Sequence, residues 1–244
     1  MSSHPRAIVK LVGESGVGFN NAKTHTEIKE KITARGYNDV KLDALLDLNG
    51  RLDRKYHEYE VKHGEQLEVT RQLEEIFQVE MDHYSLHRKM AFHVFPGDQY
   101  KGIRSQLGID EKHKDSFDGF IEQAKQFYDT AQKKPEILAG MAEFAVSSET
   151  LQERLDALEA MRRLNEVQES KKGEAKIARK ERDDLYYELR DEWSKFRTVC
   201  LFVFKNNPEY LKILNIEPYA KRTAKTNTET QGDQTDPVNP PDQA

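Results

Sequence analysis

The sequence DHYSLHRKMAFHVF at residues 82–95 returns 109 residues later as DEWSKFRTVCLFVF at residues 191–204. Extended outward without a gap, residues 19–95 and 128–204 share 16 identities over 77 positions. Chance at this composition would give roughly a third of that number. After a small gap the match resumes, with LGI at residues 107–109 over LNI at residues 214–216. The chain therefore contains an internal repeat.

Both copies have the periodicity of long helices. In the first copy one seam alternates spacings of four and three residues, and it comprises Leu73, Phe77, Glu80, Tyr84, His87, Ala91 and Val94. Such a seam is typical of a helix that packs along one side. The segments before it, residues 39–63 and 148–172, are leucine-rich and lead to Gly64 and Gly173. Because glycine suits helix ends and tight turns, each copy is predicted to form a long helical hairpin.

Together these patterns predict an all-α protein. We expect an internally duplicated, elongated four-helix up-and-down bundle, with two long hairpins related by a pseudo-twofold axis and short capping helices. The expected order is an N-terminal extension (1–18), repeat 1 (19–109), a connector (110–127), repeat 2 (128–216) and a disordered, polar tail (221–244). Within the extension, residues 7–12 (AIVKLV) alternate like a short strand, which would lie on the surface or pair with another chain.

Composition excludes several classes of partner. A net charge of −5 and a pI near 6.0 provide no cationic field for nucleic acid or for an anionic membrane surface. No stretch approaches the ~20 apolar residues of a membrane span, and the first residues lack the apolar segment of a signal peptide. We therefore expect a cytoplasmic protein. The single cysteine, Cys200, cannot form an internal disulfide, and its apolar neighbours predict that it is buried.

The sequence GESGVG at residues 13–18 resembles a phosphate-binding loop, whose backbone amides wrap phosphates. In that motif the next two positions hold a lysine and a serine or threonine, which contact phosphate and magnesium. Here they hold Phe19 and Asn20. A flexible glycine-rich segment is the favoured interpretation, and a degenerate nucleotide site is the alternative.

A second candidate site is the ExxHxxxH pattern of Glu80, His83 and His87, which places three possible metal ligands on one helical surface. Glu80 and His87 occupy seam positions that hold Leu189 and Phe196 in the second copy. Polar groups in a seam need partners. The site is either a paired polar patch, with no cofactor, or a ligand set for one divalent transition metal ion.

The predicted hairpin extends this ligand set. If the chain turns at Gly64, the level of residue 85 faces residue 43, so that Asp43 and also Asp47 could supply oxygen ligands. A second ExxH pair, Glu60 with His63, invites comparison with di-iron carboxylate bundles. In the same hairpin, however, Glu60 and Glu80 would be separated by about 18 Å along the axis, so we expect no symmetric two-metal site.

A third repeated pattern is Asp82, Ser85 and Arg88, which returns at residues 191, 194 and 197. Side chains three residues apart on a helix can pair locally, so a structural role is favoured over a partner-binding patch.

From Lys180 through WxxFR at residues 193–197 to PxxLxxLxI at residues 208–216, the second copy resembles the C-terminal signature of uncharacterised bacterial helical proteins. The resemblance covers roughly 40 residues in each copy and implies a helical fold without implying an activity. No complete catalytic motif and no small-molecule substrate can be identified. The sequence therefore favours a non-enzymatic interaction or scaffold protein, which binds a protein partner or self-associates.

Overall fold

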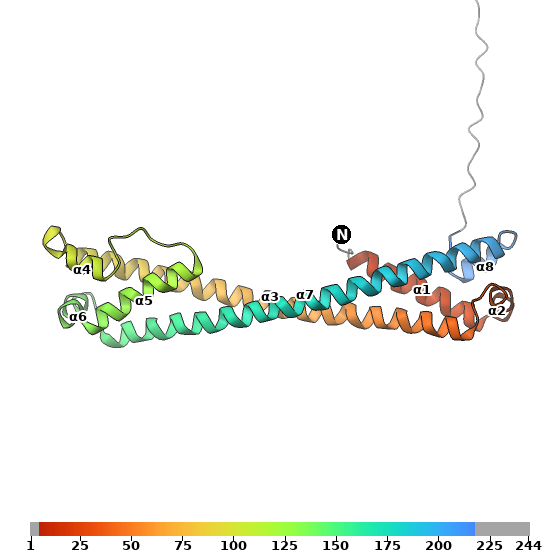
Figure 1. Cartoon of the computed structure of the whole chain (residues 1–244), viewed down its shortest axis with the longest axis horizontal. Helices are drawn as coiled ribbons and strands as arrows, with labels where there is room; N and C mark the ends of the chain where they lie inside the picture. Colours follow the sequence, from red (N-terminus) through yellow and green to blue (C-terminus); the bar gives the residue numbers. More distant parts are fainter. Residues whose placement is uncertain (1–4, 218–244) are drawn as a thin grey trace, which may run out of the picture.

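The computed structural model describes residues 5–217, and in that range it contains eight α-helices, one 3₁₀ turn and no strand (Figure 1). The all-α prediction is confirmed. No helix among the described residues is both long and apolar enough to cross a membrane. The predicted tail at residues 221–244 lies outside the described residues.

The helix boundaries repeat with the offset found in the sequence. The first half contains α1 (Pro5–Thr24), α2 (Thr26–Thr33), α3 (Asp39–Val94), a 3₁₀ turn (Asp98–Tyr100) and α4 (Lys101–Gln106). The second contains α5 (Phe117–Lys133), α6 (Pro135–Ala142), α7 (Ser148–Val203) and α8 (Pro208–Ile213). Both α3 and α7 have 56 residues, and they begin and end 109 residues apart, as do α2 and α6. Residues 5–18 of the expected extension thus form most of α1, and residues 117–127 of the expected connector form most of α5.

The two long helices lie antiparallel and span the whole molecule (Figure 1). At ~1.5 Å per residue each is about 84 Å long. Near their centre Lys62 Nζ lies 2.7 Å from a Glu174 oxygen, and Lys171 Nζ lies 2.9 Å from a Glu65 oxygen. Each of these ion pairs becomes the other when both of its residues are shifted by 109 positions.

The predicted hairpins at Gly64 and Gly173 are wrong. Both glycines lie inside continuous helices. A helix-interior glycine costs only about 1 kcal/mol relative to alanine, and the residues around it are good helix formers that continue the pattern. The helix that packs beside α3 comes from the other copy. Two long helices therefore span the molecule, in place of the four expected in the bundle.

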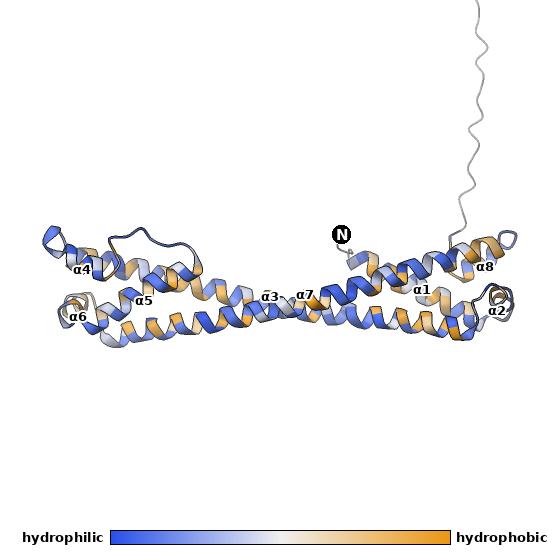
Figure 2. Cartoon of the chain, viewed as in Figure 1, coloured by the Kyte–Doolittle hydropathy of each residue, from blue (hydrophilic) through white to orange (hydrophobic). Residues whose placement is uncertain are grey.

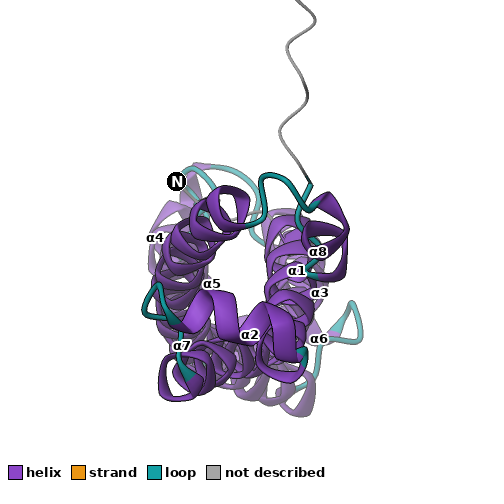
Figure 3. Cartoon of the chain, turned by 90° about the vertical axis from the view of Figure 1, so that its right-hand side faces the viewer, coloured by secondary structure: helices purple, strands orange, loops and turns teal. Residues whose placement is uncertain are grey.

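The hydrophobic residues form two separate cores. The α1 end comprises α1, α2 and α8 around the beginning of α3 and the end of α7, and α2 lies across its tip (Figure 3). The α5 end comprises α4, α5 and α6 around the end of α3 and the beginning of α7. Between them lies the waist, residues 57–72 of α3 and 166–181 of α7, which belong to neither core. Of the described helices only α3 and α7 run through this middle part (Figure 1), and hydrophilic side chains predominate there (Figure 2).

Residues 7–12, predicted as a strand, lie in α1. Helical spacing places Ile8, Leu11, Phe19 and Ala22 on its buried face, and burial of this face outweighs the local β-propensity. Gly18 lies on the same face, where an added Cβ would be 2.5 Å from Cη2 of Trp193. The large indole ring occupies the space that a side chain at residue 18 would need.

The helices α2 and α6 end in the same type of cap. Tyr37 N–H donates to the Ile32 carbonyl at 3.2 Å, and Val146 N–H donates to the Met141 carbonyl at 3.3 Å. The residue before each donor is in the left-handed region, with φ of 90° at Gly36 and 58° at Ala145. This is the Schellman geometry, which favours glycine at that position.

Candidate functional site

A cluster of buried polar side chains lies inside the α5 end. Glu80 and His87 come from α3, Tyr128 from α5 and Arg154 from α7. Arg154 Nη1 donates to Glu80 Oε1 at 2.9 Å, and the Tyr128 hydroxyl lies 3.2 Å from His87 Nδ1. Glu80 is 4% exposed, His87 6% and Tyr128 1%. Both polar seam residues noted in the sequence therefore have partners on other helices.

Burial shifts the pKa values of this cluster. It raises the pKa of the Glu80 carboxyl, although the charges of Arg154 and His83 oppose the shift. It lowers the pKa of His87 to about 4, and the positive charges of His83 and Arg154 act in the same direction. Burial also raises the pKa of the Tyr128 hydroxyl. His87 is therefore neutral near pH 7, since an imidazolium at this position would be desolvated.

Several buried polar atoms in and around the cluster have no hydrogen-bond partner among the described residues. They are Glu80 Oε2, Arg154 Nε, the Tyr84 hydroxyl and His113 Nε2. The Tyr84 and His113 rings lie 5.5 Å apart. Unpaired buried polar groups are costly, so this part of the core is less stable than an apolar core of the same shape. Its polar pairs connect α3 to α5, through His87 and Tyr128, and α3 to α7, through Glu80 and Arg154.

The cluster belongs to one end of the molecule only. The residues that are 109 positions away are all buried and apolar: Phe19, Leu45, Leu189 and Phe196. At the α1 end the Phe19 ring packs edge-on against Phe196 and Trp193, with ring centroids 5.1 and 5.3 Å apart. Sequence reasoning missed Tyr128 and Arg154. The same comparison between copies could have found them, because their counterparts are Phe19 and Leu45.

The structure does not bring the predicted metal ligands together. His83 is half-buried, and its ring centroid lies 6.2 Å from that of His87. Glu80 is engaged by Arg154. Among residues 5–217, no group of three or more His, Cys, Asp or Glu side chains is arranged to hold a metal ion. Metal binding by Glu80, His83 and His87 alone stays a prediction.

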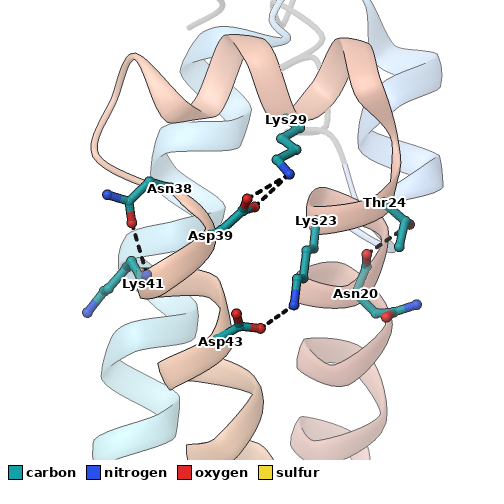
Figure 4. A network of polar contacts seen from close by, with 8 residues as sticks. All are labelled: Asn20, Lys23, Thr24, Lys29, Asn38, Asp39, Lys41 and Asp43. Carbon is teal, nitrogen blue, oxygen red and sulfur yellow. Dashed lines mark hydrogen bonds and ion pairs between the residues drawn. The ribbon is translucent and has the colours of Figure 1, made fainter.

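Asp43 lies at the opposite end from Glu80. Because α3 is continuous, the 37 residues between them correspond to about 55 Å. Asp43 pairs with Lys23 of α1, while Lys29 of α2 lies 2.7 Å from an Asp39 oxygen (Figure 4). These pairs fasten the first two helices to the start of α3. The inclusion of Asp43 and Asp47 in the ligand set is wrong, because it depended on the hairpin.

Residues 13–18 do not form a phosphate loop. They lie in the middle of α1, where the backbone N–H groups are used by the helix. Ser15 Oγ donates to the Leu11 carbonyl at 2.7 Å and accepts from Asn49 Nδ2 at 2.8 Å. The expectation of a flexible segment is wrong, and the nucleotide-site alternative loses its structural basis.

Arg88 does not act only within its own helix: it donates to the carbonyl oxygens of Ile109, at 2.6 Å, and Glu111, and so holds the segment after α4.

Cys200 is buried, as predicted, and burial raises the pKa of its thiol to about 12. An inert core thiol is expected from this environment.

No family model, curated protein or solved structure matches the chain. The resemblance to bacterial helical proteins gains no support from these comparisons. The fold and its surfaces are the remaining basis for a function.

Proposed function

We propose that this protein is a non-enzymatic, pseudo-twofold scaffold, in which the α3–α7 pair holds two different end bundles at a fixed separation. The observation that carries the proposal is the presence of two separate cores joined by a polar two-helix waist. A single catalytic domain of this length would be expected to gather its apolar residues into one core. An extended molecule instead presents two ends to two partners.

The waist is suited to a spacer. Its helices contact each other through ion pairs and hydrogen bonds, including Lys62 with Glu174 and Gln168 Nε2 with Thr70 Oγ1 at 3.3 Å. Next to the waist, the Arg182 guanidinium lies 4.1 Å from the centre of the Tyr59 ring. Polar and cation–π contacts hold a register without a wide hydrophobic core.

The polar cluster of the α5 end supports a structural role over catalysis. Its carboxylate, imidazole and phenol groups are all at least nine-tenths buried, and each is paired within the core. A catalytic acid or base must reach substrate, which these groups do not in the folded chain. The cluster gives the two ends different cores.

Cross-linking tests the proposal. The full chain is incubated in an extract of its native cells, treated with a lysine-reactive cross-linker and analysed by mass spectrometry. We expect cross-links from Lys23 or Lys29 at the α1 end to one protein and from Lys125 or Lys134 at the α5 end to another. Cross-links confined to this chain, or the same protein captured equally at both ends, would contradict a two-partner scaffold.

A further inference from the structure

At the α5 end a strap, residues 109–114, leads from α4 toward α5 without helical structure. Arg88 of α3 donates to two carbonyl oxygens of the strap. On the other side, Gln123 of α5 accepts from the N–H of Lys114 at 3.1 Å and donates to the carbonyl of Lys112 at 3.1 Å. The strap therefore bridges α3 and α5.

The chain reaches the same geometry a second time, after α8. The N–H groups of Ile109 and Ile216 each donate to the carbonyl five residues earlier, at 3.1 and 2.8 Å. Gly108 and Asn215, which precede them, are left-handed, with φ of 69° and 55°. Both isoleucines are buried in the core of their own end. The residues that follow Ile216 thus begin where, at the other end, the strap begins.

The counterparts of the two strap anchors lack such partners at the α1 end. Arg197 of α7 replaces Arg88, and it is half-buried without a hydrogen bond or ion pair to any other described residue. Glu14 of α1 replaces Gln123. Gln123 is 3% exposed next to the strap, whereas the Glu14 side chain is 35% exposed and has only Lys10 of its own helix nearby, at 3.6 Å.

The offset of 109 residues also holds between α1 and α5, so that these positions are equivalent in space. The two helices bury the same positions. They are Leu11, Ser15, Phe19 and Ala22 in α1, and Phe120, Ala124, Tyr128 and Ala131 in α5.

Trp193 provides a third unpaired group beside these anchors. It is 4% exposed, and its Nε1 has no hydrogen-bond partner among the described residues. Its counterpart, Tyr84, lies against the strap, with its ring 5.5 Å from that of His113. A buried N–H without an acceptor is costly, and a backbone carbonyl placed as in the strap can supply one.

We propose that residues 217–221 form a latch, which lies across α7 and α1 as the strap lies across α3 and α5. In this arrangement Arg197 donates to the carbonyl of Pro218, and Glu14 accepts from the N–H of Lys221. The latch closes the α1 end over its core. It does not depend on the scaffold role proposed above.

The latch repeats the chemistry of the strap. With LNI aligned on LGI, Glu217 takes the position of Asp110 and Lys221 takes that of Lys114. Pro218 lacks an N–H but keeps its carbonyl oxygen, which is the group that the strap uses at this position. The side chain of Lys221 also brings positive charge toward Glu14 on α1.

Connectivity favours this segment over any other occupant. It follows α8 directly, so that no separate linker has to be ordered and its effective concentration at the site is high. A segment from a second copy would have to compete with it.

The latch is attached on one side only. The strap continues into α5, whereas α1 belongs to the start of the chain. Arg104, which lies 2.9 Å from an Asp110 oxygen, is replaced by Leu211. The latch is therefore expected to open more readily than the strap, and opening exposes Arg197 and Trp193.

Amide hydrogen exchange of the full chain, followed residue by residue by NMR, tests the proposal. We expect the N–H of Lys221 to exchange about tenfold more slowly than in an isolated peptide of residues 214–225. The rate should not depend on protein concentration, because latch and site belong to one chain. Exchange at the peptide rate overturns the proposal. Protection that grows with concentration also overturns it, and would assign the segment to a second copy.

Variants of the two anchors test the arrangement. Glu14→Leu and Arg197→Met should each remove the protection of Lys221, while the amides of the α1 core keep their rates. Glu14→Gln, which has the residue of the other copy, should retain the protection, because its amide oxygen can accept the same bond. Arg190→Met, at an exposed position of α7, is the matched control and should change nothing. Protection that survives both anchor variants, or that is lost in the control, contradicts the latch.

Discussion

Ala145 adopts the left-handed backbone conformation that glycine adopts at the equivalent residue, Gly36. For a residue with a Cβ this conformation costs roughly 1–2 kcal/mol. We expect Ala145→Gly to raise the free energy of unfolding by about 1 kcal/mol, and Gly36→Ala to lower it by a similar amount. Urea titration measures both. If the two substitutions changed stability in the same direction, the caps would not be equivalent.

The Glu80–Arg154 pair provides a second test at the scale of residues. Arg154→Leu should cost about 3–5 kcal/mol, because it leaves a carboxylate buried without its partner. The double variant Glu80→Leu/Arg154→Leu should recover most of that loss, since Leu189 and Leu45 occupy the equivalent positions in the other core. Equal instability of the single and double variants, measured by urea unfolding, would show that the pair is not the cause.

His87 should make stability depend on pH. Its pKa is about 4 in the folded chain, against 6.5 in the unfolded chain. As pH falls between these values the unfolded chain takes up a proton first, so the free energy of unfolding falls, by at most about 3 kcal/mol. The raised pKa of Glu80 acts in the opposite sense. Urea unfolding at several pH values should show a shallower loss for His87→Phe, which has the residue of the other copy.

Sequence comparison located the polar seam residues Glu80 and His87 but not their partners. A seam position that is apolar in one copy and polar in the other is visible along the chain. Tyr128 and Arg154 differ from their counterparts Phe19 and Leu45 in the same visible way, but the sequence does not show that they meet His87 and Glu80. That pairing depends on how α5 and α7 pack against α3.

At the scale of helices, Gly64 in α3 and Gly173 in α7 are expected to lower the stability of these helices. A Cβ added at Gly64 or Gly173 would meet nothing within 4 Å. Alanine at either position should raise the free energy of unfolding by about 0.5–1 kcal/mol, because glycine has more backbone entropy to lose. Gly18→Ala is the control, and thermal melting should show a loss of about 1–3 kcal/mol from overpacking against Trp193. Destabilisation by all three would contradict this account.

The same glycines explain why the sequence misled at this scale. A helix that turns back at Gly64 and a helix that continues through it have the same periodicity on either side. The hairpin would pair residues of the same copy, whereas the structure pairs residues of different copies, from 74 positions apart for Glu80 with Arg154 to 151 positions apart for Lys41 with Glu192. Local signals do not distinguish these arrangements. The repeat length was informative because the equivalent ends of α3 and α7 are separated by the same 109 residues along the chain.

At the scale of the molecule, the two cores should respond separately to damage. Phe127 is fully buried at the α5 end, and Phe127→Ala should cost about 3–5 kcal/mol there. Amide hydrogen exchange should then accelerate in α5 and α6 and stay unchanged in α1 and α2, whose core is separate. Acceleration of equal size at both ends would mean that the waist couples them into one folding unit.

Joining the two halves in one polypeptide has a consequence for symmetry. Two identical chains paired through α3-like helices would have two identical tips, and any substitution at one tip would appear at the other. Here each tip can change alone. At the α1 end Trp193 packs against Gly18, whereas the equivalent residues at the α5 end are two aromatic ones, Tyr84 and Phe127. The two ends of the molecule are therefore distinguishable. In the proposed scaffold, two partners would be held in a defined order along the molecule as well as at a fixed separation.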